Sequence, residues 1–208
     1  MIIAMDGTAA SGKSTIARAL AENLRWNYLN SGALYRAWAH FFLEKSVEPE
    51  EEAVRPYLGT HSGPLLMLQS RVFGVGLGER ILDGELVEES VNRAVASYAR
   101  IPSLRALVTG SLRSAVEGMN AVVEGRDIGT AVFPDAALKF FLDADPKIRR
   151  KRRSAQGFQD EISARDREDS TRSCAPLAIP ADAIRVDTGY LAPNEIVGMM
   201  LDVVRERL

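Results

Sequence analysis

The chain has 208 residues, of which 46% are hydrophobic and 26% are charged, enough for one compact core with a small insertion. The formal net charge of −2 gives no overall basic field for nucleic acid, so any anion binding has to come from local clusters. The single cysteine, Cys174, excludes an internal disulfide, and with the two histidines it forms no recognised metal-binding pattern.

No part of the sequence resembles a targeting or membrane-spanning segment. The first residues, MIIAMDG, form an apolar run that is too short for a secretory signal and has no basic leader. No later segment approaches about eighteen consecutive apolar residues. We therefore expect a cytoplasmic protein that has no membrane partner.

Short apolar segments alternate with helical patterns along the chain. IIAM, at residues 2–5, reads as a buried strand, and a glycine-containing loop and the helical pattern STIARALAENL follow it. A second strand is expected to end near Leu29, with Ser31 as the cap of the next helix. NAVVEG, ALKFFLDA and AIRVDTG predict three further strands. Five strands alternating with helices predict an α/β fold with a five-stranded parallel sheet between two helical layers.

Residues 70–88 depart from this alternation. Their sequence has β-rich pieces interrupted by glycines, and DGE, at residues 83–85, is typical of a hairpin turn. We expect a small antiparallel insertion outside the main sheet.

The loop after the first strand carries the strongest motif. GTAASGKS, at residues 7–14, matches G-x-x-x-x-G-K-[ST] through Gly7, Gly12, Lys13 and Ser14. Small residues let successive amide N–H groups point into one concavity that binds a phosphate, and the following helix adds its positive end. Lys13 would bind the β- and γ-phosphates, and the Ser14 hydroxyl would contact Mg²⁺. The predicted ATP-binding residues are Gly7, Thr8, Ala9, Ala10, Ser11, Gly12, Lys13, Ser14 and Thr15.

Two other interpretations of the glycines are weaker. A flexible turn capped by a serine would not require the lysine, and it would not require the strand and helix on either side. GVGLGER, at residues 74–80, fails the dinucleotide spacing because Glu79 stands at the position of the third glycine.

Arginines after the second and third main strands predict a second anion site. Arg36 lies one turn inside the second helix, and Arg126 and Asp127 directly follow the strand NAVVEG. Both places adjoin the carboxyl ends of strands, where open α/β sheets bind ligands. A guanidinium there can hold a phosphate with two parallel hydrogen bonds.

The segment DPKIRRKRR, at residues 145–153, has three interpretations: a mobile lid over the phosphates, a solvated helix face, or a nucleic-acid patch. We favour the lid because ARDREDSTR follows about a dozen residues later and because the net charge is close to zero.

Taken together, these segments resemble the bacterial cytidylate kinases of the nucleoside monophosphate kinase group of P-loop proteins. The similarity covers nearly the full length, and SGALYR and GRDIGTAVFPDA are its most specific segments, with IPSLR, RDREDSTR and APL beside them. The resemblance implies Mg²⁺-assisted phosphoryl transfer from ATP to CMP or dCMP. It implies catalytic roles for Lys13, Arg126 and Arg165, and a CMP site made of Ser31, Arg36, Arg105, Arg126, Asp127, Arg165, Asp169 and Arg172.

The base assignment is chemically consistent. Cytosine offers an amino donor to a carboxylate such as Asp127 and a ring-nitrogen acceptor to Arg105. Uracil reverses both groups and would leave desolvated partners unpaired, at about 1–3 kcal/mol each. No general base is needed, because the attacking phosphate oxygen is already anionic.

The sequence departs from the family pattern in three places. The loop reads GTAASGKS, where the family usually has a proline or another glycine. Ala96 stands where a serine commonly contacts the base, with Ser97 beside it. The span from Arg153 to Arg165 is short, which implies a short lid.

The predicted organisation is a single kinase domain. Its core comprises residues 1–30, 119–146 and 176–208, its nucleoside monophosphate region about 31–116, and its lid about 150–172. We expect a monomer whose partners are ATP and CMP or dCMP, without nucleic acid. Three alternatives stay open: a kinase of another acceptor such as UMP, AMP or a sugar acid, a nucleotide-dependent switch protein, and a nucleic-acid-binding NTPase.

Overall fold

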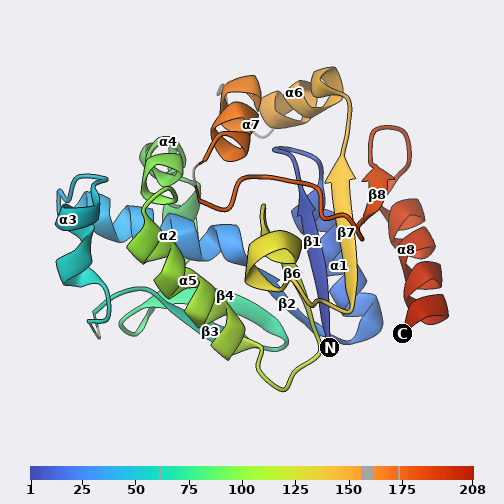
Figure 1. Ribbon diagram of the computed structural model, residues 1–208, viewed down its shortest axis with the longest axis horizontal. Coiled ribbons are helices and arrows are strands. Elements are labelled where there is room, and N and C mark those ends of the chain that lie inside the picture. Colours follow the sequence, from blue (N-terminus) through green and yellow to red (C-terminus); the bar gives the residue numbers. More distant parts are fainter. Residues whose placement is uncertain (61, 156–161, 173) are drawn as a thin grey trace. The chain divides into compact units, whose positions relative to one another are not determined.

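The chain, in a computed structural model, forms two compact units (Figure 1). Unit 1 comprises Met1–Tyr28 and Gly118–Leu208, and unit 2 comprises Leu29–Glu117. The structure describes residues 1–60, 62–155, 162–172 and 174–208, with the backbone alone for residues 162–165. The border between the units falls close to the one expected between the core and the nucleoside monophosphate region. The functional meaning of the division stays a prediction.

Unit 1 is built on strands β1 (Ile2–Gly7), β6 (Ala121–Glu124), β7 (Leu138–Asp143) and β8 (Ile184–Asp187). β1 pairs with β6 on one side and with β7 on the other, β8 pairs with β7, and all three pairings are parallel. β2 (Asn27–Asn30) follows β6 in the strand order. The predicted α/β fold with a mostly parallel sheet is confirmed.

The central strands are apolar because the sheet of unit 1 is buried on both faces. In β1, Ile3, Ala4 and Met5 have no exposed surface, and β6 is buried throughout. Such continuous apolar runs are typical of parallel strands covered on both sides. Polar side chains are therefore confined to the ends of the strands.

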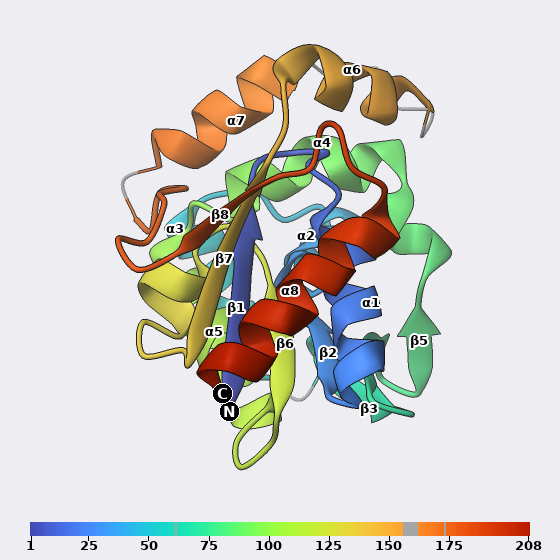
Figure 2. The same cartoon turned by 90° about the vertical axis from the view of Figure 1, so that its right-hand side faces the viewer.

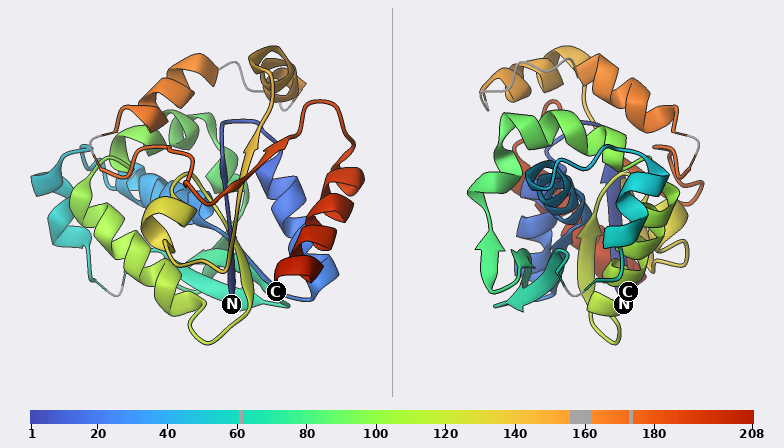
Figure 3. Two further views of the ribbon diagram at one scale, coloured as in Figure 1. Left: turned by 45° about the vertical axis from the view of Figure 1, so that its right-hand side comes forward. Right: turned by 90° about the vertical axis from the view of Figure 1, so that its left-hand side faces the viewer.

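Helices α1 (Lys13–Leu24) and α8 (Pro193–Arg207) pack against each other beside this sheet (Figure 2). Ile16, Leu20 and Met200 are buried there. Figure 3 shows α6 (Pro146–Ala155) and α7 (Ile162–Ser170) beyond the carboxyl ends of β1 and β7. The carboxyl ends of the strands and these two helices thus border the same region of unit 1.

Unit 2 is organised around α2 (Ser31–Glu44), which contacts α4 (Glu89–Tyr98) and α5 (Pro102–Ala115). The shorter elements are α3 (Glu51–Val54), η1 (Arg55–Tyr57) and η2 (Gly84–Val87). An aromatic cluster fills the space around α2 with rings that meet edge to face or tilted, and it consists of Trp38, Phe41, Phe42, Tyr57 and Tyr98.

The predicted antiparallel insertion is present, but its strands belong to the main sheet instead of lying outside it, and its turns differ from the expectation. Strands β3 (Leu65–Gln69), β4 (Val72–Leu77) and β5 (Arg80–Leu82) pair antiparallel. The turn between β3 and β4 is formed by Ser70 and Arg71, and both residues have positive φ. The DGE segment, which was expected to form a hairpin turn, leads into η2. The turn at Ser70–Arg71 could not be predicted, because neither residue is the glycine or asparagine that usually adopts positive φ.

The cap of α2 is also a correction. The Asn30 side chain accepts a hydrogen bond from the Ala33 amide at 3.1 Å, whereas Ser31, the predicted cap, is the first helical residue. Asparagine and serine are about equally good caps, so the sequence did not distinguish Asn30 from Ser31, and the predicted cap was one residue too late.

Gly7 is required where the phosphate loop leaves β1. Its φ is +154°, and a Cβ at this position would lie 2.0 Å from the carbonyl oxygen of Leu142 on β7. We expect Gly7→Ala to lower the free energy of unfolding by about 2 kcal/mol or more, because a side chain there would separate β1 from β7. Urea denaturation followed by circular dichroism measures the change.

Gly198→Ala is the matched control, because a Cβ at Gly198 in α8 would meet nothing within 4 Å. Alanine there should leave stability unchanged or raise it by up to about 1 kcal/mol. Equal effects of the two substitutions would contradict the role given to Gly7.

Candidate functional site

The predicted phosphate loop of unit 1 has the required backbone form. It runs from the end of β1 to α1, with Ala10 at φ 55° and Gly12 at φ 85°. Left-handed residues alternating with ordinary ones turn successive amide groups toward one side, as an anion-binding concavity requires. The geometry therefore supports phosphate binding at the start of α1.

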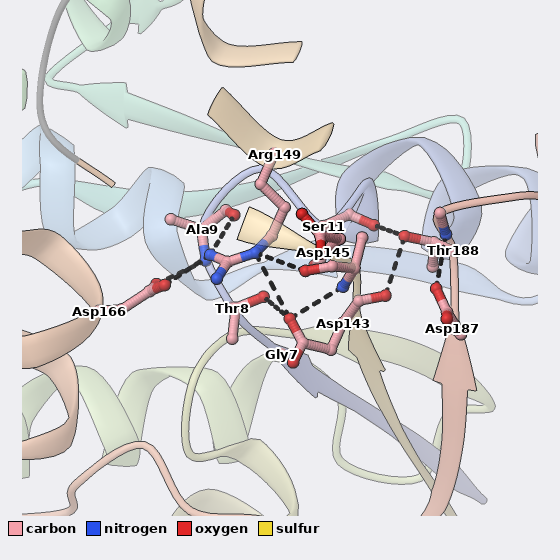
Figure 4. Close-up of polar contacts among 12 residues, drawn as sticks. Gly7, Thr8, Ala9, Ser11, Asp143, Asp145, Arg149, Asp166, Asp187 and Thr188 are labelled. Atoms are coloured by element: carbon pink, nitrogen blue, oxygen red, sulfur yellow. Dashed lines mark hydrogen bonds and ion pairs between the residues drawn. The ribbon is translucent and has the colours of Figure 1, made fainter. Parts of the chain in front are cut away.

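Side chains hold the loop to the neighbouring strands (Figure 4). The Thr8 hydroxyl donates to Asp143 Oδ1 at the end of β7 over 2.6 Å. The hydroxyl of Thr188, which is 1% exposed, donates to the Ser11 carbonyl at 2.7 Å. The loop is thus anchored before any ligand binds.

Lys13 lies over the loop that it follows. Its Nζ donates to the Thr8 carbonyl at 2.7 Å and lies 3.5 Å from Ser11 Oγ. The pKa of Lys13 is lowered to about 7, chiefly by desolvation and then by the positive charge of Arg126, while the negative charges of Glu124, Asp6 and Asp169 act in the opposite direction. The charge of Lys13 is thus sensitive to what binds beside it.

Arg126 lies next to the same loop. Its Nη1 donates to the Gly7 carbonyl at 2.6 Å, and its Nε lies 3.1 Å from Asp169 Oδ2 in α7. Asp169 also pairs with Arg172, whose Nη2 is 3.6 Å from Oδ1. The structure therefore brings together four of the predicted residues, all within unit 1: Lys13, Arg126, Asp169 and Arg172.

The basic segment at residues 145–153 is not simply a solvated face. Arg149 in α6 is 5% exposed, and it donates to the carbonyls of Ala144 and Ala9 and to Asp166 of α7 (Figure 4). Asp166 also accepts a hydrogen bond from the Ala9 amide at 3.1 Å. A carboxylate of α7 thus bonds an amide of the phosphate loop itself.

Arg152 is the second residue of α6 tied to the core. Its guanidinium donates to the hydroxyl of Thr188 at 3.1 Å and to the Thr188 carbonyl. Through Thr188, α6 is therefore linked to Ser11 of the loop as well. These contacts exclude a plain solvated face for this segment, and the lid stays a prediction.

Unit 2 contains three of the predicted acceptor residues, whereas Asp127, which is 4% exposed, lies in unit 1. Ser31 is 4% exposed at the start of α2, and Arg36 lies one turn further along the same helix. Arg105 is 4% exposed, donates to the Ala99 carbonyl at 2.9 Å and lies 5.4 Å from the centre of the Tyr35 ring. Within unit 2, Arg105 is thus held by a backbone carbonyl and an aromatic face.

Two predicted positions carry less information. The side chain of Arg165 lies outside the described residues, so its role stays a prediction. Ser97, the neighbour of Ala96 in α4, is exposed.

Candidate metal ligands are sparse in the described part of the chain. Ser14 and Thr15 are exposed in the first turn of α1. Among the described residues, no group of three or more histidine, cysteine, aspartate or glutamate side chains could hold a metal ion. Any Mg²⁺ would therefore arrive with phosphate oxygens and take at most a few protein ligands.

Sequence reasoning missed Asp6, Asp143, Arg149 and Asp166. Asp6 is 1% exposed at the end of β1, and its pKa is raised to about 6, chiefly because burial disfavours the charged form. The sequence did contain one indication for Asp6, because it is a carboxylate at the end of an otherwise apolar strand. The contacts of Arg149 and Asp166 had no signal, because they join segments that are distant in sequence.

No helix among the described residues is both long enough and apolar enough to cross a membrane.

Comparison with known proteins agrees with these features. The family model described as cytidylate kinase matches residues 3–206. A cytidylate kinase of Mycobacterium leprae is 37% identical over 221 residues, covering 100% of this chain and 96% of that protein. One from Geobacillus thermodenitrificans is 37% identical over 218 residues, covering 99% of this chain and 97% of that protein.

A solved structure of shikimate kinase from Bacteroides thetaiotaomicron has a TM-score of 0.51 at 12% identity, covering 99% of this chain and 98% of that chain. That likeness concerns the fold alone. Since the family model spans almost all of the sequence and full-length relatives exceed one third identity, the chain belongs to the cytidylate kinase family.

Proposed function

We propose that the protein transfers the γ-phosphoryl group of ATP to CMP and dCMP, forming ADP and CDP or dCDP. The observation that carries this proposal is the placement of Lys13 and Arg126. Both cations bond carbonyls of one phosphate loop, at Thr8 and Gly7 respectively, in a chain of the cytidylate kinase family. Two cations at the start of a phosphate-binding helix suit the transfer of a phosphoryl group between anionic oxygens.

The donor site is the loop from Gly7 to Thr15. Its amides would bind the β-phosphate, and the positive end of α1 would add to their effect. Lys13 is close enough to the loop to contact the β- and γ-phosphates, and a triphosphate beside it would favour its ammonium form.

Mg²⁺ fits this donor site. The Ser14 hydroxyl is a hard oxygen ligand, exposed in the first turn of α1 and next to Lys13. Mg²⁺ keeps several waters and is commonly held by one or two protein ligands together with substrate phosphates. When bound, it neutralises charge on the β- and γ-phosphates.

The acceptor residues follow the family resemblance. Ser31, Arg36 and Arg126 are proposed to hold the phosphate of CMP, and Arg165, Asp169 and Arg172 to reach the sugar and the phosphates. Supporting this, the bond from Arg126 to the Gly7 carbonyl holds its guanidinium beside the donor cradle. A guanidinium oriented in advance loses little freedom when it binds a phosphate.

Arg105 and Asp127 are proposed to recognise cytosine. Both are 4% exposed, so each unmet hydrogen bond would cost its desolvation energy. A carboxylate facing the amino group and a guanidinium facing N3 match cytosine, and uracil presents the opposite pattern to both. Asp127 is therefore assigned to recognition and not to proton transfer.

The remaining expectations complete the proposal. Unit 1 would hold the core and the short lid, and unit 2 the nucleoside monophosphate region. We further propose a monomer that works in the cytoplasm and does not need nucleic acid.

An acceptor panel tests the reaction and the base contacts together. With ATP and Mg²⁺, CMP and dCMP should be phosphorylated at least about thirtyfold more efficiently than UMP, since two reversed hydrogen bonds cost about 1–3 kcal/mol each. A coupled assay for ADP measures kcat/KM for CMP, dCMP, UMP, AMP and a sugar acid. Equal efficiency with UMP and CMP would refute the base assignment.

Arg126→Ala should weaken the binding of CMP as well as slow the reaction. One charge-assisted bidentate contact contributes about 1.5–3 kcal/mol, so KM for CMP should rise about tenfold to a hundredfold. Arg205→Ala is the control, since in the contacts described Arg205 pairs only with nearby Asp202, and both side chains are exposed on α8. If KM for CMP is unchanged in the Arg126 variant, this arginine is structural.

Lys13→Ala should lower kcat by several orders of magnitude with only a modest change in KM for CMP. Its charge matters most while the phosphoryl group moves, because the transition state spreads negative charge over oxygens beside it. Steady-state kinetics at saturating ATP measure the effect. A turnover close to that of the unaltered protein would remove Lys13 from the reaction.

A further inference from the structure

The carboxylate of Asp6, near the end of β1, is not among the groups assigned to a nucleotide. Its side chain is almost wholly buried, with 1% of the residue exposed. Oδ1 accepts a hydrogen bond from the Ile128 amide at 2.8 Å, and Oδ2 accepts one from the Gly129 amide at 2.7 Å. Both oxygens of one carboxylate therefore bind consecutive backbone amides of another segment.

Those amides begin η3 (Ile128–Val132), a short π-helical turn. In this turn the Asp127 carbonyl accepts bonds from the amides of Ala131 and Val132, so the first amides have no partner within it. A carboxylate is the favoured partner for such amides, because the start of a helical turn carries partial positive charge. Asp6 thus caps η3 from a strand more than a hundred residues away.

The bonds belong to a continuous set that joins the end of β1 to the segment after β6. The Gly125 amide donates to the Met5 carbonyl at 3.0 Å, and Arg126 donates to the Gly7 carbonyl. Asp6, between Met5 and Gly7, binds the residues that follow Asp127. The segment that carries Arg126 and Asp127 is therefore held to the strand that leads directly into the phosphate loop.

The lack of a side chain at Gly129 allows the Asp6 carboxylate to come close to the backbone of η3. A Cβ at this position would lie 3.1 Å from Lys139 Cδ, 3.1 Å from Pro180 Cγ and 3.3 Å from Asp6 Oδ2. A side chain at position 129 would therefore push these neighbours, Asp6 among them, aside by a few tenths of an ångström.

We propose that Asp6 is a positioning residue that sets the orientation of Arg126 and Asp127 relative to the phosphate loop. This inference rests on the proposed function, because it takes these two residues as the acceptor-binding ones. Removing one bond would let the segment shift, and a small misplacement of a substrate-binding group is costly in a transfer reaction.

Because Asp6 can gain a proton, its positioning role should depend on pH. The pKa of Asp6 is raised to about 6 by burial, and the nearby negative charge of Asp127 raises it too. The two amide bonds and the positive charge of Lys13 lower it. Lys139, whose stem packs on Gly129, pairs with Asp182 at 2.8 Å. The carboxylate is thus ionised at pH 8 and becomes protonated as the pH falls through about 6.

Asp6→Asn tests the proposal, because asparagine keeps the shape but can accept only one of the two bonds. At pH 8 we expect KM for CMP to rise about tenfold while KM for ATP changes less than threefold, since the ATP cradle is anchored by Asp143 and Thr188 instead. The ratio of KM for CMP between variant and unaltered protein should shrink toward one near pH 5.5, where Asp6 is itself protonated. Taking the ratio removes the titration of the substrate phosphate.

Asp182→Asn is the matched control, a carboxylate-to-amide change in the same unit that should leave both KM values unchanged. If Asp6→Asn does not fold, Gly129→Ala displaces the carboxylate from the opposite side and should raise KM for CMP selectively. An unchanged KM for CMP, a parallel rise for both substrates, or a ratio independent of pH would overturn the positioning role. Failure of the unaltered protein to phosphorylate CMP would instead refute the proposed function.

The hydrogen bonds of Asp6 can also be measured without any enzymatic activity, and so even if the protein does not phosphorylate CMP. In NMR spectra of the ligand-free protein, the amide signals of Ile128 and Gly129 should titrate with an apparent pKa near 6, the value for Asp6, and the titration should vanish in Asp6→Asn. Amide signals that are insensitive to pH in the unaltered protein would also overturn the inference.

Discussion

The site depends on keeping two cations, Lys13 and Arg126, beside one short loop despite their repulsion. Arg126 lowers the pKa of Lys13, and desolvation lowers it further. The negative charges of Glu124, Asp6 and Asp169 act against both effects, and backbone carbonyls of the loop accept hydrogen bonds from both cations. Without such partners, two desolvated cations could not be held there.

The need for negative charge beside the two cations also explains why carboxylates of α7 contact the loop and Arg126. Asp169 pairs with Arg126, and Asp166, three residues earlier, accepts the Ala9 amide. Residues three apart lie on one face of a helix, so a single face of α7 presents both carboxylates to groups suited to phosphate. In the ligand-free protein these carboxylates supply the negative charge that a nucleotide is proposed to bring.

Much of this could be predicted from the sequence, for identifiable reasons. The continuous apolar strands and the phosphate-loop spacing are local signals, and they placed β1 and α1 correctly. The turn at Ser70–Arg71 was not predictable, because neither residue type favours positive φ. The contacts of Asp6 with Ile128 and of Arg149 with Ala9 join residues more than a hundred positions apart, and no pattern in one sequence reports them.

Thr8 has a mechanical consequence for the loop. A proline at this position would stiffen the backbone covalently through its ring, at every pH and in every state of the protein. Threonine leaves that rotation open and limits it through the bond from its hydroxyl to Asp143. The loop is therefore held by separate hydrogen bonds instead of a covalent ring, and the bond to the end of β7 acts beside those of Ser11 with Thr188 and of Ala9 with Asp166.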